Sequence, residues 1–331
     1  MDVRNRRALK ESARYSLDTA LYDPKKLILL HTGVTIAASL IATTINFILT
    51  KQIETTGGLG GLGMRSVLST VESVLKLFVL VVMPFWEVGF CFATMNIARG
   101  KEAAPQSLLE GFRRFWPLLK AYLLQGFVYL GVAIISYFLS FQIYLFTPLS
   151  NSMFELVSSL DLTSPEIALT LDDATMLAIM DAYTPMLLIF LAVFLLAVLF
   201  VSYRFRMVNY LLLDHPGMGA REALHLSRYQ MRGHKADLFK LDLSFLWFYV
   251  LQVLASVIAY GDYLIAFFDI PIGFSAEVAF FVFLLLSLAC QGILYYRARN
   301  KVEVTYATFY CATQLPIHKD TAPEQNPWTN S

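Results

Sequence analysis

Charged residues and cysteines are both scarce in this sequence, and each scarcity excludes a class of protein. Only 15% of the 331 residues are charged, whereas soluble domains hold about 25%. The three cysteines form no CxxC pair and no cluster with histidine. We therefore expect no disulfide framework, no metal and no cofactor. The formal net charge is only +1, so we expect no nucleic-acid partner.

Motifs for catalysis and nucleotide binding are missing as well. The run GGLGGLG at 57–63 fits GxGxxG only in its letters, because no strand precedes it and no Lys-Ser or Lys-Thr follows it. The chain has no HExxH sequence and no nucleophile elbow. We therefore predict a loop at 51–66, no catalytic residues, and a protein that is not an enzyme.

Long apolar runs are what the sequence has in abundance. Hydrophobic residues make up 57% of the chain. A helix of about 20 apolar residues crosses the roughly 30 Å hydrocarbon core of a bilayer, so these runs predict membrane spans. We expect an all-α fold, a polytopic membrane helical bundle. Its six expected transmembrane helices lie at about 27–50, 77–97, 121–146, 185–203, 241–261 and 275–296.

The distribution of Lys and Arg predicts how this bundle is oriented. The arm 1–26, the segments 98–120 and 204–240, and the chain after the sixth span together hold 23 of the 26 basic residues. The positive-inside rule places these four segments in the cytoplasm. The acidic segment 147–184, which has no Lys or Arg, is then an outer segment. The expected location is the bacterial cytoplasmic membrane, with both termini inside.

The resulting domain plan has three parts. Residues 1–26 form a cytoplasmic amphipathic arm, 27–301 a six-span membrane domain, and 302–331 a cytoplasmic tail whose end, from Leu315, is disordered. In the arm, Leu9 and Ala13 recur at helical spacing among basic residues. Such a helix either lies on an anionic leaflet or packs on the protein's own loops.

Two further helices are expected to lie in the plane of the membrane on the cytoplasmic side. In SLLEGFRRFW (107–116), the apolar side is formed by Leu108, Leu109, Phe112, Phe115 and Trp116. The second helix is Ala220–Arg232, which Gly233 ends. A further helix then begins near His234 and runs into the fifth span.

A few polar residues inside or beside the spans are candidate functional residues. Glu87, with Pro84 one turn earlier, lies within the second span, where a carboxylate is costly unless it is protonated or paired. It could serve transport, or it could bind a neighbouring helix. His31, near the start of the first span, is expected to reach the lipid headgroups, with a proton relay as the alternative.

The remaining candidates come from the basic segment 204–240 and the start of the fifth span. Arg228 and Arg232, one turn apart, could contact lipid phosphates or could only determine topology. His234 and Asp242 are helix-start residues in the simpler interpretation. In an enzyme they would act with His225 and Asp237 as acid–base or metal groups.

The same region carries a resemblance to a known family through the run E-A-L-x-x-S-x-x-x-M-x-G-h-K-x-x-x-F-x-L-x-L-S-F. The matching residues are Glu222, Ala223, Leu224, Ser227, Met231, Gly233, His234, Lys235, Phe239, Leu241, Leu243, Ser244 and Phe245. Two shorter segments agree, one with Pro84, Gly89, Arg99, Gly100, Gly111 and Phe112, the other with Ala307, Phe309 and Tyr310. The chain thereby resembles the bacterial membrane family called domain of unknown function 975. That family is similar to membrane domains found beside glycerophosphodiesterases, and the resemblance implies no specific activity.

Three functions are compatible with these features. We favour a non-enzymatic membrane protein, either an envelope factor or a transport-associated factor. The alternative is a transporter of a small solute or lipid that uses Glu87, and an enzyme acting on lipid headgroups is less favoured. The expected partners are the bilayer, anionic lipid headgroups, and a membrane protein or a second copy of the chain.

Overall fold

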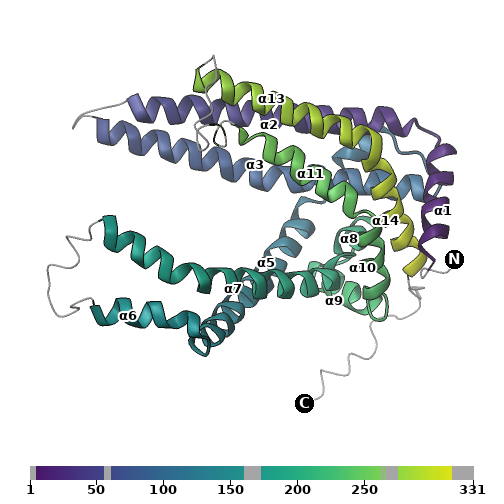
Figure 1. Cartoon of the computed structure of the whole chain (residues 1–331). Helices are drawn as coiled ribbons and strands as arrows, with labels where there is room; N and C mark the ends of the chain where they lie inside the picture. The colour runs from purple at the N-terminus through teal and green to yellow at the C-terminus, as the bar shows by residue number, and fades with distance from the viewer. Residues whose placement is uncertain are drawn as a thin grey trace.

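The computed structural model describes residues 5–55, 61–159, 173–261, 263, 265 and 275–314, and these residues are almost entirely helical with no strand among them (Figure 1). The predicted all-α fold is thus confirmed. The long helices form pairs that lie side by side. The pairs are α2 (Pro24–Thr55) with α3 (Gly61–Ala98), α5 (Phe115–Leu145) with α7 (Asp173–Phe205), and α11 (Leu246–Ile258) with α13 (Ala276–Leu294).

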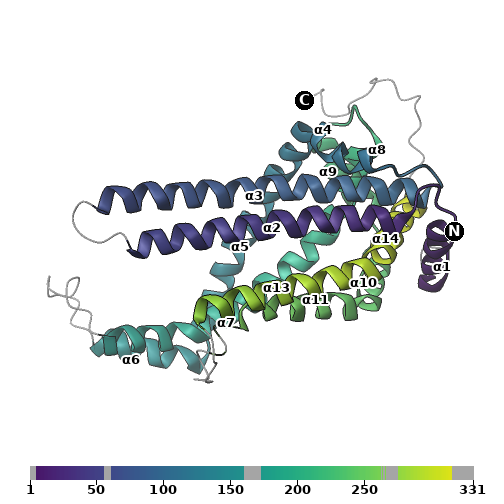
Figure 2. The ribbon, with the colours of Figure 1, turned by 90° about the horizontal axis from the view of Figure 1, so that it is seen from above.

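Shorter helices gather at one end of the three pairs, and we call this assembly the hub (Figures 1 and 2). The hub consists of α1 (Arg6–Asp18), α4 (Glu110–Arg113), α8 (Val208–Asp214), α9 (Ala220–Gln230), α10 (Lys235–Ser244) and α14 (Asn300–Thr313). A 3₁₀ turn at Pro105–Leu109 leads into α4, and α6 (Asn151–Ser159) lies away from the hub, after a second 3₁₀ turn at Pro148–Ser150. The pairs therefore extend from one common base.

Among the described residues, five helices are long and apolar enough to cross a membrane, and a sixth crossing results if α10 and α11 count as one bent span. Large apolar side chains along these helices are exposed, for example Phe127 at 70% and Leu196 at 69%. Exposed apolar surface of this kind marks contact with lipid or with other protein. The fold is therefore compatible with a multi-pass membrane protein.

The fifth predicted span is not one continuous helix. Helices α10 and α11 meet at an angle of 57°, and Phe245 lies between them with φ −111° and ψ 10°. The Phe245 side chain is buried at 5% exposure and packs in the main core. Burying Phe245 in the hub bends the chain between α10 and α11, so the run from His234 into the fifth span is a bent pair of helices rather than one continuous helix.

The segment before α5 also differs from its prediction. Leu108 is buried, whereas Leu109 and Trp116 are exposed at 49% and 67%. The chain here is a 3₁₀ turn followed by one short helix, and α5 already begins at Phe115 rather than near residue 121. The expectation of a single helix over 107–116 is therefore wrong, because the chain breaks at Arg114 and the segment packs against α3.

The contact of that segment with α3 is made by backbone on backbone. A Cβ atom on Gly89 would lie 1.8 Å from the carbonyl oxygen of Leu108, and one on Gly111 would lie 2.0 Å from that of Phe85. Only glycine fits at both positions without moving the backbone. Both glycines belong to the part of the family resemblance that also contains Pro84 and Arg99. The close approach of the two backbones explains why glycine stands at these positions.

The end of the chain differs most from the prediction. The sixth span was expected to end near residue 296, with a tail after it, but α13 continues through a π-helical turn at Tyr295–Arg299 into α14. Val302, Tyr306 and Tyr310 on α14 are almost fully buried. Helix α14 is therefore a central element of the hub, because its apolar and aromatic side chains fill the space between α1, α3 and α8.

The N-terminal arm was expected either to lie on an anionic leaflet or to pack on the protein's own loops, and the described residues distinguish the two. Leu9 and Ala13 are each 1% exposed, and α1 contacts α14 and α3. The arm thus packs on the protein. Most of the loop expected at 51–66 is helical instead, because α2 continues to Thr55 and α3 begins at Gly61. Residues 56–60, residues 160–172 of the acidic segment, most of 262–274 and the chain from Leu315 lie outside the described residues.

Candidate functional site

Helix α14 carries a row of polar side chains along one face. Arg299 stands just before the helix, and Glu303, Tyr306, Tyr310 and Gln314 follow at spacings of three or four residues, which place them on the same side. Arg299 closes the π-helical turn, and such turns are frequent at functional sites. Three members of the row each bind an acidic residue from a different element, and this creates three polar clusters.

The first cluster joins α14 to α3 through Glu87. Arg299, with its side chain 9% exposed, donates a hydrogen bond to the Glu87 carboxylate and stacks over the Phe90 ring at 5.1 Å. His31 lies 3.9 Å from the other Glu87 oxygen and stacks on Trp86 with ring centroids 5.3 Å apart. Glu87 therefore has a cationic partner inside the protein.

His31 differs from its prediction. Its ring is fully buried at 0% exposure between Trp86 and Phe90, so it does not reach a lipid headgroup. Neither ring nitrogen has a hydrogen-bond partner among the described residues. Pro84 lies inside α3 one turn before Glu87, and α3 continues through it.

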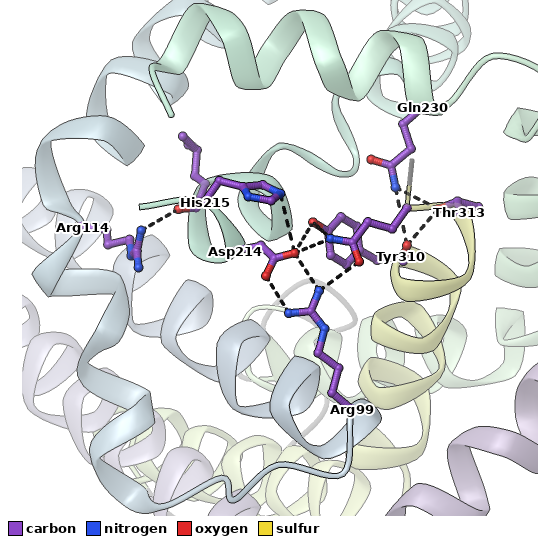
Figure 3. A network of polar contacts seen from close by, with 9 residues as sticks. Arg99, Arg114, Asp214, His215, Gln230, Tyr310 and Thr313 are labelled. Atoms are coloured by element: carbon purple, nitrogen blue, oxygen red, sulfur yellow. Dashed lines mark hydrogen bonds and ion pairs between the residues drawn. The ribbon is translucent and has the colours of Figure 1, made fainter. Parts of the chain in front are cut away.

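The second cluster lies at the end of α8 and is drawn in Figure 3. Arg99 directs both terminal nitrogens at Asp214, with N–O distances of 2.6 and 2.7 Å. Tyr310 donates its hydroxyl to the same carboxylate at 3.0 Å, and Gln314 donates its side-chain amide. Hydrogen bonding to Asp214 raises the pKa of Arg99, so the guanidinium stays charged.

This cluster ties together three parts of the hub. Arg99 follows the end of α3, Asp214 ends α8, and Tyr310 belongs to α14. Gly100, directly after Arg99, has φ +67°, the left-handed conformation in which glycine commonly ends a helix. A forked arginine–carboxylate pair fixes direction as well as distance. The pair therefore determines how α8 sits on the end of α3.

The third cluster surrounds Asp242, which lies in the C-terminal part of α10. Tyr203 donates to one carboxylate oxygen at 2.6 Å and Tyr306 donates to the other at 2.5 Å. Since Tyr306 has one hydroxyl proton, Tyr249 donates to Tyr306, at 2.9 Å. The Arg206 guanidinium lies 4.8 Å from the Tyr306 ring. Asp242 thereby links α7, α10, α11 and α14, and is not in the first turn of a span.

A pocket of about 340 Å³ opens beside this third cluster. We call it the Asp242 pocket. It is lined by Leu199, Ser202, Tyr203, Arg206, Phe239, Asp242, Leu243, Leu246 and Tyr249. One end is polar and the other is aliphatic and aromatic, so the pocket suits an amphiphilic ligand.

The remaining predicted residues do not join these clusters. Arg228 and Arg232 are exposed on and just after α9, and the Arg232 guanidinium lies 5.5 Å from the Tyr229 ring. His234 precedes α10, and its Nδ1 is 3.7 Å from Asp237. In the described ranges, no three His, Cys, Asp or Glu residues stand together as a metal-binding group. Glu87 and Asp242 lie in separate clusters.

Sequence reasoning missed three residues of these clusters. The sequence pattern singles out none of them: Arg206 and Arg299 count only among the basic residues of the cytoplasmic segments, and Asp214 lies between the fourth and fifth spans. The available signal was the spacing of 299, 306 and 310, which is helical and pairs a cation with two tyrosines. That signal was hidden because the helix was expected to end before Arg299.

The segments that carry the family resemblance meet in the hub. Ser227 on α9 accepts a hydrogen bond from Met207 N–H and donates one to the Arg204 carbonyl, so α9 closes the break between α7 and α8. Gly233, with φ +83°, turns the chain between α9 and α10 as predicted. Ala307, Phe309 and Tyr310 are fully buried on α14.

Comparison with known proteins agrees with the family resemblance seen in the sequence. No curated protein and no solved structure matches the chain. A family model described as "Protein of unknown function (DUF975)" matches residues 1–314, which include every element of the hub. The chain belongs to this uncharacterised family.

Proposed function

We propose that the protein is a non-enzymatic, multi-pass protein of the bacterial cytoplasmic membrane, whose hub lies at the cytoplasmic face. In this proposal the three helix pairs anchor the chain in the bilayer. The hub is the part that contacts lipid headgroups or a protein partner. The observation that carries the proposal is that three apolar pairs share one base in which the basic residues are concentrated.

The distribution of charge supports this orientation. Arg6, Arg99, Arg204, Lys235 and Arg299 all lie in the hub or at the hub ends of the long helices. The opposite end of the α2–α3 pair has Lys51, which lies 3.7 Å from Glu277. An excess of Lys and Arg on one side of the spans is the feature that faces the cytoplasm.

The pairing of the acidic groups supports a non-enzymatic role. Glu87 binds Arg299, Asp214 binds Arg99 in a fork, and Asp242 accepts hydrogen bonds from two tyrosines. Each bond joins elements that are far apart in the sequence. Groups arranged in this way hold helices together. A transporter using Glu87 has less support, because the carboxylate is bound to a cation of its own chain.

Reporter fusions test the orientation. We expect alkaline phosphatase fused after Thr163 to be active, and a green fluorescent protein fused after Gly217 to be fluorescent. The matched control exchanges the two reporters, and both exchanged fusions should be silent. An inactive phosphatase after Thr163 together with an active one after Gly217 would show the hub outside, and the proposal would be wrong.

A further inference from the structure

The Asp242 pocket combines an open cation with apolar walls. Arg206 is an exposed residue that lines the pocket. In the described part of the chain it has neither a hydrogen bond nor a carboxylate within ion-pair distance, and its guanidinium lies 4.8 Å from the Tyr306 ring. An arginine fork in this state is suited to bind a phosphate with two parallel hydrogen bonds.

The other end of the pocket opens onto apolar surface. Leu199, Phe239, Leu243 and Leu246 are between 45% and 54% exposed. Leu199 belongs to α7 and Leu246 to α11, two helices that present apolar faces along their length. A ligand with its head at Arg206 would therefore direct its tail along the surface that the bilayer covers.

The cations in and near the pocket favour a ligand that carries a negatively charged group. The Arg204 guanidinium and the Lys235 ammonium lie 5.1 and 4.8 Å from the Phe200 ring, next to the lining residue Leu199. Neither residue lines the pocket, but both add positive charge beside it, and among the lining residues Arg206 is the one cation and Asp242 the one acid. Each Asp242 oxygen accepts a tyrosine hydroxyl and still has a free lone pair, so it can accept a hydroxyl of the ligand.

We infer that the Asp242 pocket binds an anionic phospholipid with a hydroxylated headgroup, such as phosphatidylglycerol. The phosphate binds Arg206, a headgroup hydroxyl donates to Asp242, and the acyl chains lie over Leu199 and Leu246. This deepens the proposed function, since it rests on the pocket's polar end lying at the cytoplasmic leaflet. It assigns the lipid contact to a built site rather than to the exposed arginines of α9.

The test measures lipid binding to the full-length chain in detergent by native mass spectrometry. Titration with phosphatidylglycerol should give a first bound lipid at least roughly tenfold tighter than phosphatidylcholine. Arg206→Gln should weaken that binding about tenfold, the loss expected for a charge-assisted hydrogen-bond pair. Arg206→Lys keeps the charge without the fork and should lie between. Arg297→Gln removes an exposed arginine from the hub end of another helix and should change nothing.

Each of the following outcomes would overturn this assignment. Arg206→Gln could bind phosphatidylglycerol like the wild type at an unchanged melting temperature, or Arg297→Gln could weaken binding equally. Millimolar inorganic phosphate could displace the lipid completely, which would mark a free-phosphate site instead. If Arg206→Gln does not fold, an Arg206→Lys variant that folds and binds like the wild type refutes the role of the fork. Binding in detergent does not depend on orientation, so this test and the reporter fusions fail independently.

Discussion

Replacing Asp214 by asparagine should destabilise the protein strongly, because it removes the carboxylate that binds Arg99 at the hub. The side chains of Asp214 and Arg99 are only 14% and 20% exposed, and two hydrogen bonds of 2.6 and 2.7 Å join them. Asparagine keeps the size of the side chain but leaves the arginine cation without its partner. Removing one member of a mostly buried pair costs about 3 kcal/mol.

Thermal unfolding in detergent, followed by size-exclusion chromatography of the heated sample, measures this effect. For a chain of this size about 3 kcal/mol corresponds to a melting temperature lower by roughly 5 °C. Asp18→Asn is the matched control, because Asp18 pairs with Arg14 at 3.9 Å with both side chains more than 70% exposed. Exposed pairs contribute at most about 1 kcal/mol, so the control should unfold near the wild-type temperature.

A double-mutant cycle separates the ion pair from the rest of the cluster. Arg99→Gln alone should cost about as much as Asp214→Asn, since it removes the forked arginine from a carboxylate that then has the Tyr310 and Gln314 hydrogen bonds and His215 at 3.8 Å. The double variant Arg99→Gln/Asp214→Asn should be more stable than the sum of the two losses predicts, because no unpaired charge remains. If Asp214→Asn behaves like Asp18→Asn, or if the two losses simply add, the pair does not hold α8 on α3.

Three further predictions concern the other contacts of the hub. In size-exclusion chromatography, Gly89→Ala should abolish the monodisperse elution peak, because its Cβ would lie 1.8 Å from a carbonyl oxygen. The control Gly126→Ala has open space around it and should elute normally. Equal elution profiles would refute the backbone crossing. Glu87→Gln should lower the melting temperature by leaving the buried Arg299 cation unpaired, and adding Arg299→Gln should recover part of the loss; a larger loss in the double variant would contradict the pairing. Tyr306→Phe should cost about 2 kcal/mol because it removes the hydroxyl between Asp242 and Tyr249, and unfolding at the wild-type temperature would mean that this hydroxyl does not hold the cluster.

Several elements could be predicted because their determinants are local. Gly233 ends α9 as expected, since a residue with positive φ is needed there and glycine adopts it freely. The arm around Leu9 and Ala13 forms a helix because its apolar residues recur with the period of one. The long apolar runs form long helices, as their length and composition predicted.

The errors share one cause. Arg299 was expected to stop a span because a cation in an apolar run normally marks its end. In the structure, Glu87 from a helix more than 200 residues earlier binds that cation, and the helix continues into α14. Phe245 looked like one more apolar residue of the fifth span, and only its burial in the hub bends the chain there. Both outcomes depend on partners that local pattern does not reveal.

The sequence by itself determined the class of this protein: apolar runs long enough to cross a bilayer and basic segments that favour one side of it, because span length and charge are properties of single segments. The tertiary structure alone decided which polar groups meet. Asp214, Asp242 and Glu87 come from three separate segments, and one helix brings a partner to each. Such pairings follow from how helices pack, since a buried charge is stable only where a distant residue supplies its hydrogen bonds.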